Sequence, residues 1–210
     1  MAISVEKLVL GALETNTYII TETESGVSAV VDPATDDQRL FKALENKNVE
    51  YIFLTHGHFD HILGAKSVKE KTGAKVVIHE NDAPFLNSET LSLYYLHYAD
   101  SMPKVNADVL TVGGMTIRFG NEIVKIMHTP GHTKGGTCYI FEDSRIIFSG
   151  DTLFNMSAGR TDFPGGSARE ELMSLSDLAK LHGDYKVYCG HGPDTTLDFE
   201  RKNNRYVRIR

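Results

Sequence analysis

The chain contains only two cysteines, Cys138 and Cys189, and both lie within apolar runs. Two cysteines in 210 residues do not make a disulfide scaffold, and they suit a reducing compartment. No apolar run reaches the length of a membrane span, and the first residues lack the sustained apolar stretch of a signal peptide. We therefore expect a cytoplasmic protein that does not bind a membrane.

Positive charge is also scarce, because 22 Lys and Arg face 28 Asp and Glu, a net charge of −6. Such a chain has no global basic field that would attract nucleic acid, so we expect no nucleic-acid partner. Basic residues do gather near the end of the sequence, and we interpret them as the solvated face of a terminal helix. They are Arg201, Lys202, Arg205, Arg208 and Arg210. The oligomeric state is left open.

No Pro/Gly/Ser linker, low-complexity run or short repeat divides the sequence, which predicts a single domain over residues 1–210. Short β-type runs alternate with helical segments in both halves, and this alternation predicts a layered α/β domain. Strands are expected over 3–10, 17–21, 27–31, 51–55, 75–79, 109–112, 115–119, 122–127, 138–141, 145–149 and 186–189. Helices are expected over 36–47, over 62–72 with Gly73 as its stop, after the capping pair Ser167 and Glu170, and over 196–206.

One short string concentrates polar side chains of the ligand type. His56, His58, Asp60 and His61 fall within HGHFDH, directly after an apolar strand. The ends of strands are where α/β sheets place their ligand sites. Four such groups are poor core material, because each needs a polar partner when it is buried. A lone histidine would be interpreted as a surface residue, but this string indicates a metal site.

Three further ligand-type residues have the same setting. His132 lies in HTPGHTKGG, Asp151 in SGDTLF and His191 in CGHGPDTT. Each follows a predicted strand and lies close to glycine, which lets the backbone turn tightly without a Cβ clash. Together with HGHFDH, four strand ends therefore supply one predicted metal centre.

Through these strings the sequence resembles the metallo-β-lactamase superfamily over nearly its whole length. The resemblance implies an αββα sandwich with the site at one edge, between two facing sheets. It implies a first metal bound by His56, His58 and His132, a second bound by Asp60, His61 and His191, and Asp151 as the bridge. Asp32, in VVDP, resembles the aspartate that lies beneath the first histidines; a simple turn residue is the equal alternative.

Imidazole and carboxylate ligands suit zinc, iron or manganese, and we expect two divalent transition-metal ions with zinc as the first choice. A metal-held hydroxide would then attack a polarised acyl carbonyl. Asp60 is the expected catalytic residue, because it can orient that hydroxide as well as bind a metal.

The substrate must be inferred from the residues around the ligands. Asp151 argues against β-lactam hydrolysis, because β-lactamases of this superfamily lack the bridging aspartate. TPGHTKGG and GDTLF resemble glyoxalase II, which hydrolyses S-acylglutathione thioesters. Arg160 falls where that enzyme has a basic residue for glutathione, and a guanidinium could pair with a carboxylate there; a structural salt bridge is the equal alternative. The sequence ends soon after CGHGPDTT, so it resembles the short, single-domain members.

Two other functions stay open. The GRTDF string resembles persulfide dioxygenases, in which the counterparts of His58, His132 and Asp151 hold one iron. The third hypothesis is a metal-dependent binding or regulatory protein that catalyses no reaction.

Histidines outside these strings receive other interpretations. His79 and His128 are expected to be structural residues of their strands. His97, among the tyrosines of segment 94–98, is expected at the pocket wall.

Overall fold

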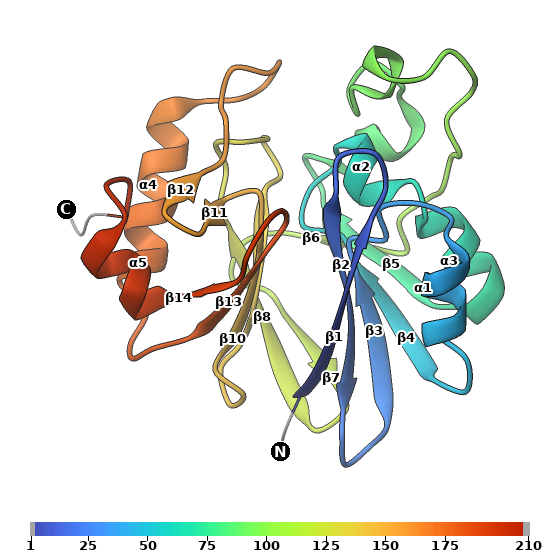
Figure 1. Cartoon of the computed structure of the whole chain (residues 1–210), viewed down its shortest axis with the longest axis horizontal. Coiled ribbons are helices and arrows are strands. Elements are labelled where there is room, and N and C mark those ends of the chain that lie inside the picture. Colours follow the sequence, from blue (N-terminus) through green and yellow to red (C-terminus); the bar gives the residue numbers. More distant parts are fainter. Residues whose placement is uncertain (1–2, 208–210) are drawn as a thin grey trace.

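The structure is a computed structural model that describes residues 3–207. Within that range the strands form two six-stranded sheets and one small hairpin (Figure 1). The first sheet contains, in spatial order, β1 (Ile3–Leu10), β2 (Thr15–Glu22), β3 (Val27–Val31), β4 (Asn48–Phe53), β5 (Lys75–His79) and β6 (Val109–Thr111). The second contains β14 (Thr195–Thr196), β13 (Lys186–Cys189), β10 (Ile146–Gly150), β9 (Thr137–Phe141), β8 (Glu122–His128) and β7 (Thr116–Phe119). The hairpin is β11 (Leu153–Phe154) with β12 (Ser157–Ala158).

Alternating side chains along the strands divide the interior into three apolar layers. Between the sheets lie aromatic residues from both halves of the chain, including Tyr18, Phe53, Phe119, Phe141 and Phe148. Strand β3 is buried along its whole length because it is covered on both faces, which explains its continuous apolar sequence.

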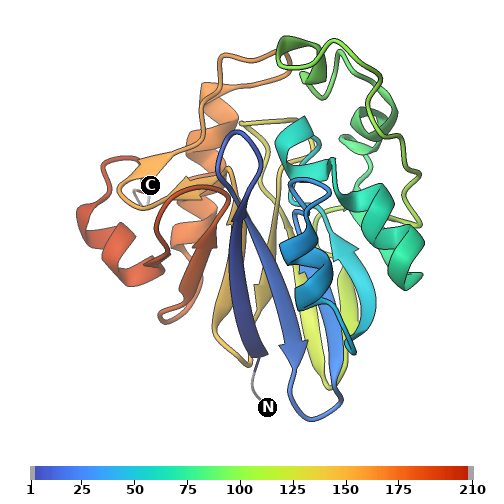
Figure 2. The same cartoon turned by 45° about the vertical axis from the view of Figure 1, so that its right-hand side comes forward.

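Helices cover the outer face of each sheet (Figures 1 and 2). Leu40 of α1 (Gln38–Ala43) and Val68 of α3 (Ala65–Thr72) pack on the first sheet. Leu175 of α4 (Ala168–Ala179) and Leu197 of α5 (Leu197–Asn203) pack on the second. The order helix, sheet, sheet, helix confirms the expected αββα sandwich.

The ends of several helices differ from the sequence expectation. The predicted helix over 62–72 is two helices, α2 (Phe59–Ile62) and α3, and α3 ends at Gly73 with φ of +75°, as predicted. The capping pair is confirmed, since the Ser167 side chain accepts a hydrogen bond from the Glu170 backbone N–H. Helix α1 is shorter than expected at both ends, because the Asp37 side chain caps its start and Asn46, with φ of +62°, lies outside the helical region near its end. Among residues 3–207, none of the helices has the length and apolar character needed to cross a membrane.

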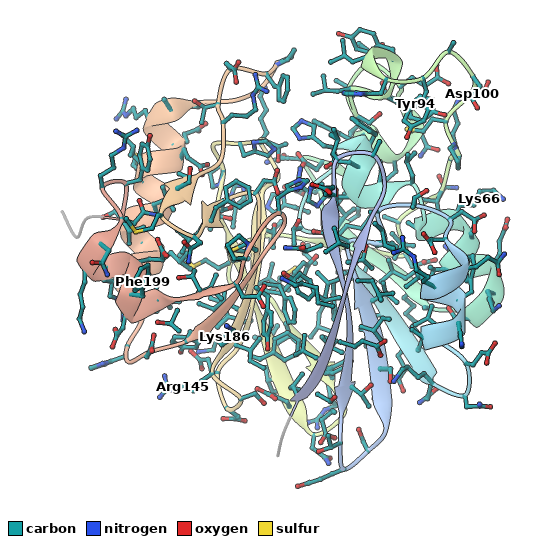
Figure 3. All side chains as sticks on the ribbon, in the orientation of Figure 1. Lys66, Tyr94, Asp100, Arg145, Lys186 and Phe199 are labelled. Atoms are coloured by element: carbon teal, nitrogen blue, oxygen red, sulfur yellow. The ribbon has the colours of Figure 1, made fainter. Side chains whose placement is uncertain are left out.

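The segment between β5 and β6 has little regular structure, as expected. It contains the 3₁₀ helices η1 (Ala83–Asn87) and η2 (Tyr94–Leu96) and extends over α2 at one end of the molecule (Figure 3). Tyr94 is buried, stacks on Tyr98 and donates a hydrogen bond to Asp100 Oδ1 at 2.8 Å. These contacts are internal to the segment, and the Phe59 backbone N–H, which donates to the Ser92 carbonyl oxygen at 2.9 Å, joins it to α2.

The basic cluster near the C-terminus is not simply a solvated face. Arg201 donates hydrogen bonds to the carbonyl oxygens of Ala179 and Gly183 and pairs with Asp198 at 2.6 Å. Its guanidinium therefore joins α5 to the end of α4. Arg208 and Arg210 of the same cluster lie outside the described residues.

Candidate metal centre

All seven predicted ligand residues meet at one edge of the sandwich, where four strands end. His56 follows β4, and His132 follows β8. Asp151 directly follows β10, and His191 comes two residues after β13. Neighbouring parallel strands, such as β10 and β13, bring their carboxyl ends to the same edge of a sheet. The N-terminal half thus supplies HGHFDH, and the C-terminal half supplies the other three residues.

Three histidines form a first cluster. His58 Nδ1 lies 2.9 Å from His132 Nε2, and the ring of His56 lies 4.9 Å from each of the other two rings. One nitrogen of each of the three rings lies within 4.8 Å of the others. The cluster is buried, and His56 Nε2 has no hydrogen-bond partner. We call these three residues the histidine cluster.

Asp60, His61 and His191 form a second cluster with the same spacing of donor atoms. Asp60 Oδ2 lies 3.2 Å from His191 Nε2 and 3.3 Å from His61 Nε2. His61 Nε2 is buried without a hydrogen-bond partner. We call these three residues the mixed cluster.

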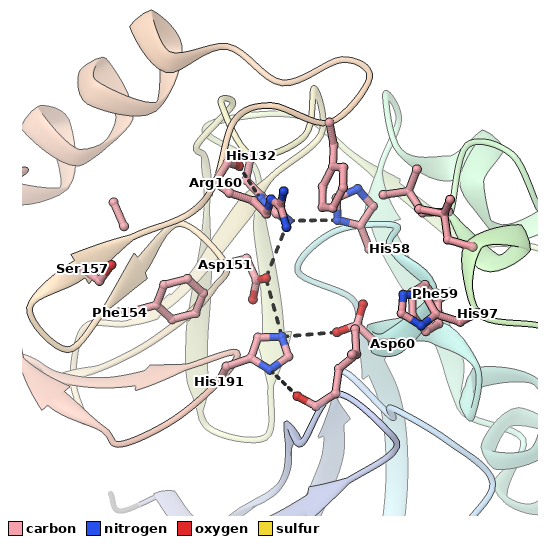
Figure 4. A pocket seen from close by; sticks show the side chains of 15 residues that line it. His58, Phe59, Asp60, His97, His132, Asp151, Phe154, Ser157, Arg160 and His191 are labelled. Atoms are coloured by element: carbon pink, nitrogen blue, oxygen red, sulfur yellow. Dashed lines mark hydrogen bonds and ion pairs between the residues drawn. The ribbon is translucent and has the colours of Figure 1, made fainter.

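Asp151 lies between the two clusters, and its carboxylate faces both (Figure 4). Its Oδ2 atom lies 3.6 Å from His132 Nε2 and 3.6 Å from His191 Nε2. Its Oδ1 atom lies 3.4 Å from His61 Nε2 and has no hydrogen-bond partner. The geometry of Asp151 is that of a group placed to contact two sites at once.

Backbone and side-chain acceptors hold the imidazole rings in place. His132 Nδ1 donates to the carbonyl oxygen of Arg160 at 2.7 Å, and His191 Nδ1 donates to that of Leu13 at 3.1 Å. When Nδ1 is the donor, the lone pair of Nε2 faces the centre of the site. The proton positions required of metal ligands are therefore set from outside the two clusters.

Asp32 supports a candidate ligand histidine, as the resemblance implied, but the ring that it contacts directly is the third histidine of HGHFDH rather than the first two. Its Oδ2 atom accepts hydrogen bonds from His61 Nδ1 at 2.9 Å and from the Thr55 hydroxyl at 2.6 Å. Thr55 Oγ1 in turn lies 3.2 Å from His56 Nδ1. Asp32 thus orients the third histidine of HGHFDH directly, and it reaches the first only through Thr55.

Sequence reasoning missed Asp82, a buried carboxylate that ties together the loops carrying the histidine cluster. It accepts hydrogen bonds from the backbone N–H of Gly57 at 2.9 Å, from the Thr133 hydroxyl at 2.7 Å and from the backbone N–H of Gly135 at 2.7 Å. Gly57 separates two ligand histidines, and Thr133 follows the third. No local signal in HENDAPF identifies this role, because all three donors are distant in sequence.

The beginning of β2 supplies two further residues that the sequence reasoning did not identify. Thr15 Oγ1 donates to Asp60 Oδ2 at 3.0 Å, and Asn16 Nδ2 donates to the carbonyl oxygens on either side of His191. Between those carbonyls lies Gly190, where a Cβ atom would come within 2.2 Å of Asp151 Oδ1. Only glycine fits at that position.

Electrostatics separate the two clusters. Burial and the neighbouring imidazoles hold the pKa of His56 well below its ordinary value. Burial, with His132 adjacent, lowers the pKa of His58 to about 3. These two rings are therefore neutral throughout the physiological pH range, in the form that binds metal.

In the mixed cluster the carboxylates reverse this effect. Burial favours neutral His61, but Asp60, Asp151 and Asp32 outweigh it and hold the pKa of His61 well above its ordinary value. Burial is likewise outweighed at His191, whose pKa is raised by Asp60 and Asp151. Burial would raise the pKa of Asp60, yet the adjacent His61 and His191 hold it well below its usual range.

A pocket of about 520 Å³ opens onto both clusters. Its lining includes the apolar side chains of Leu93, Leu96, Phe154 and Phe163, which approach from both halves of the molecule. Phe154 and His97 lie on opposite sides of the site (Figure 4). His97 lines the pocket, as expected, and its ring lies 4.8 Å from that of Phe59. The tyrosines of segment 94–98 are not among the lining residues, although Tyr94 and Tyr98 pack edge-on against Phe59, which is.

Arg160 lines the pocket, but its side chain already has a carboxylate partner. Its Nε and Nη2 atoms donate to the two carboxylate oxygens of Asp162, both at 2.7 Å. The guanidinium also lies over the ring of Phe163, 4.1 Å from its centroid. The structural salt bridge that the sequence left open is therefore present.

His79 and His128 lie outside both clusters, as expected. Their rings stack at 4.1 Å, His79 Nδ1 accepts from the Asn81 backbone N–H, and His128 Nε2 donates to the Lys134 carbonyl oxygen. The structural role predicted for them agrees with these contacts.

Residues 10–191 match the family described as the Metallo-beta-lactamase superfamily, and the chain belongs to it. It is therefore a member of a superfamily of metallo-hydrolases whose proteins bind divalent metals. The hydroxyacylglutathione hydrolase of Pelagibacter ubique is 32% identical over 90% of this chain and 69% of its own length. The hydroxyacylglutathione hydrolase GloC of Haemophilus influenzae is 28% identical over 97% of this chain and 98% of its own length.

Three solved structures share the fold. BLEG-1, described as a B3 metallo-β-lactamase, has a TM-score of 0.91 and 29% identity over 97% of this chain and 99% of its own. TTHA1623 in a di-iron-bound form has a TM-score of 0.85 and 30% identity, over 96% and 100% of the two chains. ETHE1 from Myxococcus xanthus has a TM-score of 0.78 and 25% identity, over 96% and 83%.

Proposed function

We propose that the chain is a thioesterase of the glyoxalase II type, in which two divalent transition-metal ions lie at the histidine and mixed clusters. The observation that carries this proposal is Asp151, whose two carboxylate oxygens face both clusters at 3.4–3.6 Å. Two sets of three donors, one on each side of this carboxylate, offer places for two ions.

The residues present fit two such ions. Imidazole and carboxylate donors suit zinc, iron and manganese. Three buried atoms of the site have no hydrogen-bond partner: His56 Nε2, His61 Nε2 and Asp151 Oδ1. A metal cation bound among these ligand atoms would supply the missing partner. Zinc is the first choice for these ions, and the di-iron form of TTHA1623 makes iron the main alternative.

The proposed chemistry divides between the ions and the protein. When bound, two divalent ions would polarise an acyl carbonyl and lower the pKa of water to roughly 7. Asp60 would orient the attacking water, since its Oδ2 atom is fixed by Thr15 Oγ1 and lies beside His191. The apolar lining of the pocket would hold the acyl or thiol portion of the substrate and exclude bulk water.

The relatives support thioester chemistry over a short chain. GloC of Haemophilus influenzae covers 97% of this chain and is itself covered over 98%, so the two match nearly end to end. We propose S-acylglutathione or related acyl thioesters as substrates, with residues 1–210 acting as a single domain. A cytoplasmic location remains part of this proposal.

The GRTDF string carries a second candidate, a mononuclear-iron persulfide dioxygenase. This hypothesis requires His58, His132 and Asp151 to bind a single iron ion. His58 Nδ1 lies 2.9 Å from His132 Nε2, and Asp151 Oδ2 lies 3.6 Å from the same nitrogen. The relatives described as hydroxyacylglutathione hydrolases favour the dinuclear hydrolase, and the dioxygenase is the alternative for experiment to exclude.

The test is to purify the protein, measure its metal content, and compare three reactions. These are hydrolysis of S-lactoylglutathione, oxygen uptake with glutathione persulfide, and hydrolysis of a chromogenic cephalosporin. Two metals per chain with thioester hydrolysis are expected. One iron with oxygen uptake would replace the proposal by the dioxygenase, and preferential cephalosporin turnover would replace it by a β-lactamase like BLEG-1.

A further inference from the structure

The pocket contains one Lys or Arg among its described lining residues, and that residue is Arg160. Its guanidinium is held on two sides. Asp162 accepts both of the hydrogen bonds described above, and Phe163 supports the planar face. Phe163 is itself held beside the site, because its ring lies edge-on to His58 at 5.6 Å. The cation is thus oriented by its own loop.

Such a pair competes with any carboxylate that a substrate brings. Asp162 is two residues from Arg160, so its effective concentration at the guanidinium is far above that of a dissolved ligand, on the order of millimolar or more. Bidentate geometry uses the paired donors that would recognise a substrate carboxylate. Both side chains are more than half exposed, at 58% and 65%. Replacement of Asp162 would therefore leave the Arg160 guanidinium accessible to a ligand.

We propose that Asp162 is a specificity-determining residue: by occupying Arg160, it directs the enzyme toward acyl thioesters whose thiol portion carries no carboxylate. This inference rests on the proposed thioesterase function and narrows its substrate class. A glutathione thioester carries two carboxylates, and here it meets a pocket whose remaining wall is largely apolar. A thioester with a neutral thiol portion has no carboxylate to pair with Arg160, so its binding does not depend on a free guanidinium.

The experiment uses two substrates with the same acyl group, S-lactoylglutathione and S-lactoyl-N-acetylcysteamine. For each metal-loaded variant we would measure the ratio of kcat/KM for the charged substrate to kcat/KM for the neutral one. The variants are Asp162→Asn, Arg160→Gln and the double substitution. Asp177→Asn is the matched control, because Asp177 forms an ion pair of the same length, 2.7 Å, with Lys180 at similar exposure.

Asp162→Asn should raise the ratio about two- to fivefold, the range that corresponds to one exposed ion pair. The increase should vanish in the Arg160→Gln background and should not occur in Asp177→Asn. The affinity for S-methylglutathione, measured by calorimetry, should rise in parallel, and this measurement does not depend on turnover.

Three results would overturn the inference. One is an unchanged ratio in Asp162→Asn. Another is an equal increase with and without Arg160, which would show a general charge effect. The third is wild-type preference for the glutathione thioester that Arg160→Gln abolishes. If the wild-type protein hydrolyses neither thioester, the proposed function itself fails, and the substrate class inferred from it falls with it.

Discussion

The two clusters have the same number of donor residues but opposite electrostatic settings. The histidine cluster is buried, and His56 and His58 have pKa values below the ordinary range. The mixed cluster contains Asp60 and lies against Asp32 and Asp151, so the pKa of His61 is raised. A cation therefore enters the histidine cluster with little competition from protons. At the mixed cluster a cation must displace the protons of the imidazole rings, but the neighbouring carboxylates attract it.

Each cluster also has its own supporting carboxylate. Asp82 holds the loops of the histidine cluster through Gly57 and Gly135. Asp32 holds the mixed cluster directly through His61 and reaches His56 only through Thr55. Substitution of either carboxylate should therefore perturb one site more than the other. Asp151 is the shared residue through which a change at one site reaches the other.

The largest effect is expected from Asp60→Ala. Loss of this carboxylate removes a donor of the mixed cluster and the group proposed to orient water, so kcat for thioester hydrolysis should fall by more than about a hundredfold. Circular dichroism should be unchanged, and metal analysis should show selective loss of one of the two ions. Near-normal turnover by the folded variant would disprove the dinuclear mechanism.

Asp82→Asn and Asp32→Asn should give intermediate and contrasting effects. Supporting residues of this kind typically change metal affinity by about 10- to 100-fold. Calorimetric titration of metal-free protein with zinc should show a weakened first site in Asp82→Asn and a weakened second site in Asp32→Asn.

A matched control for these variants is Glu122→Gln. Glu122 is also fully buried and accepts two hydrogen bonds from Ser144, but it lies at the far end of β8 from the site. The Glu122→Gln variant should have a lower free energy of unfolding but an unchanged zinc affinity at both sites. The comparison between clusters would be wrong if Asp82→Asn and Asp32→Asn weakened the same site.

Acidification should release one ion before the other, the smallest of these effects. A ligand imidazole must be deprotonated to bind metal. His61 and His191 have raised pKa values, so their protons compete with metal at a higher pH than do those of His56 and His58. Because both raised pKa values lie above the ordinary histidine value of about 6.5, the metal content should already be decreasing from two ions per chain to one as pH falls toward that value. Dialysis at stepped pH followed by elemental analysis measures this, and simultaneous release of both ions would contradict it.

Much of the fold could be predicted from local sequence, because it depends on near neighbours. The strand Val27–Val31 is a continuous apolar run, Gly73 ends α3, and Ser167 caps α4. The helix over 62–72 was predicted less accurately, since Phe59–Ile62 forms a separate short helix whose first backbone N–H donates to the distant Ser92 carbonyl oxygen. Hydrophobic periodicity carries no information about such contacts.

The seven candidate ligands could be predicted from the sequence alone, because His and Asp residues at strand ends and next to glycines form a recognisable pattern. The family resemblance also implied how they divide into two sets. Only the tertiary structure decided how these side chains are supported. The hydrogen bonds of Asp82, Asp32 and Thr15 each join segments more than 20 residues apart. The pairing of Arg160 with Asp162 is local, yet its meaning was also decided by the structure. The string GRTDF is compatible with both an Arg160–Asp162 ion pair and a free Arg160 guanidinium. The conformation of the loop places the two side chains together and so forms the ion pair.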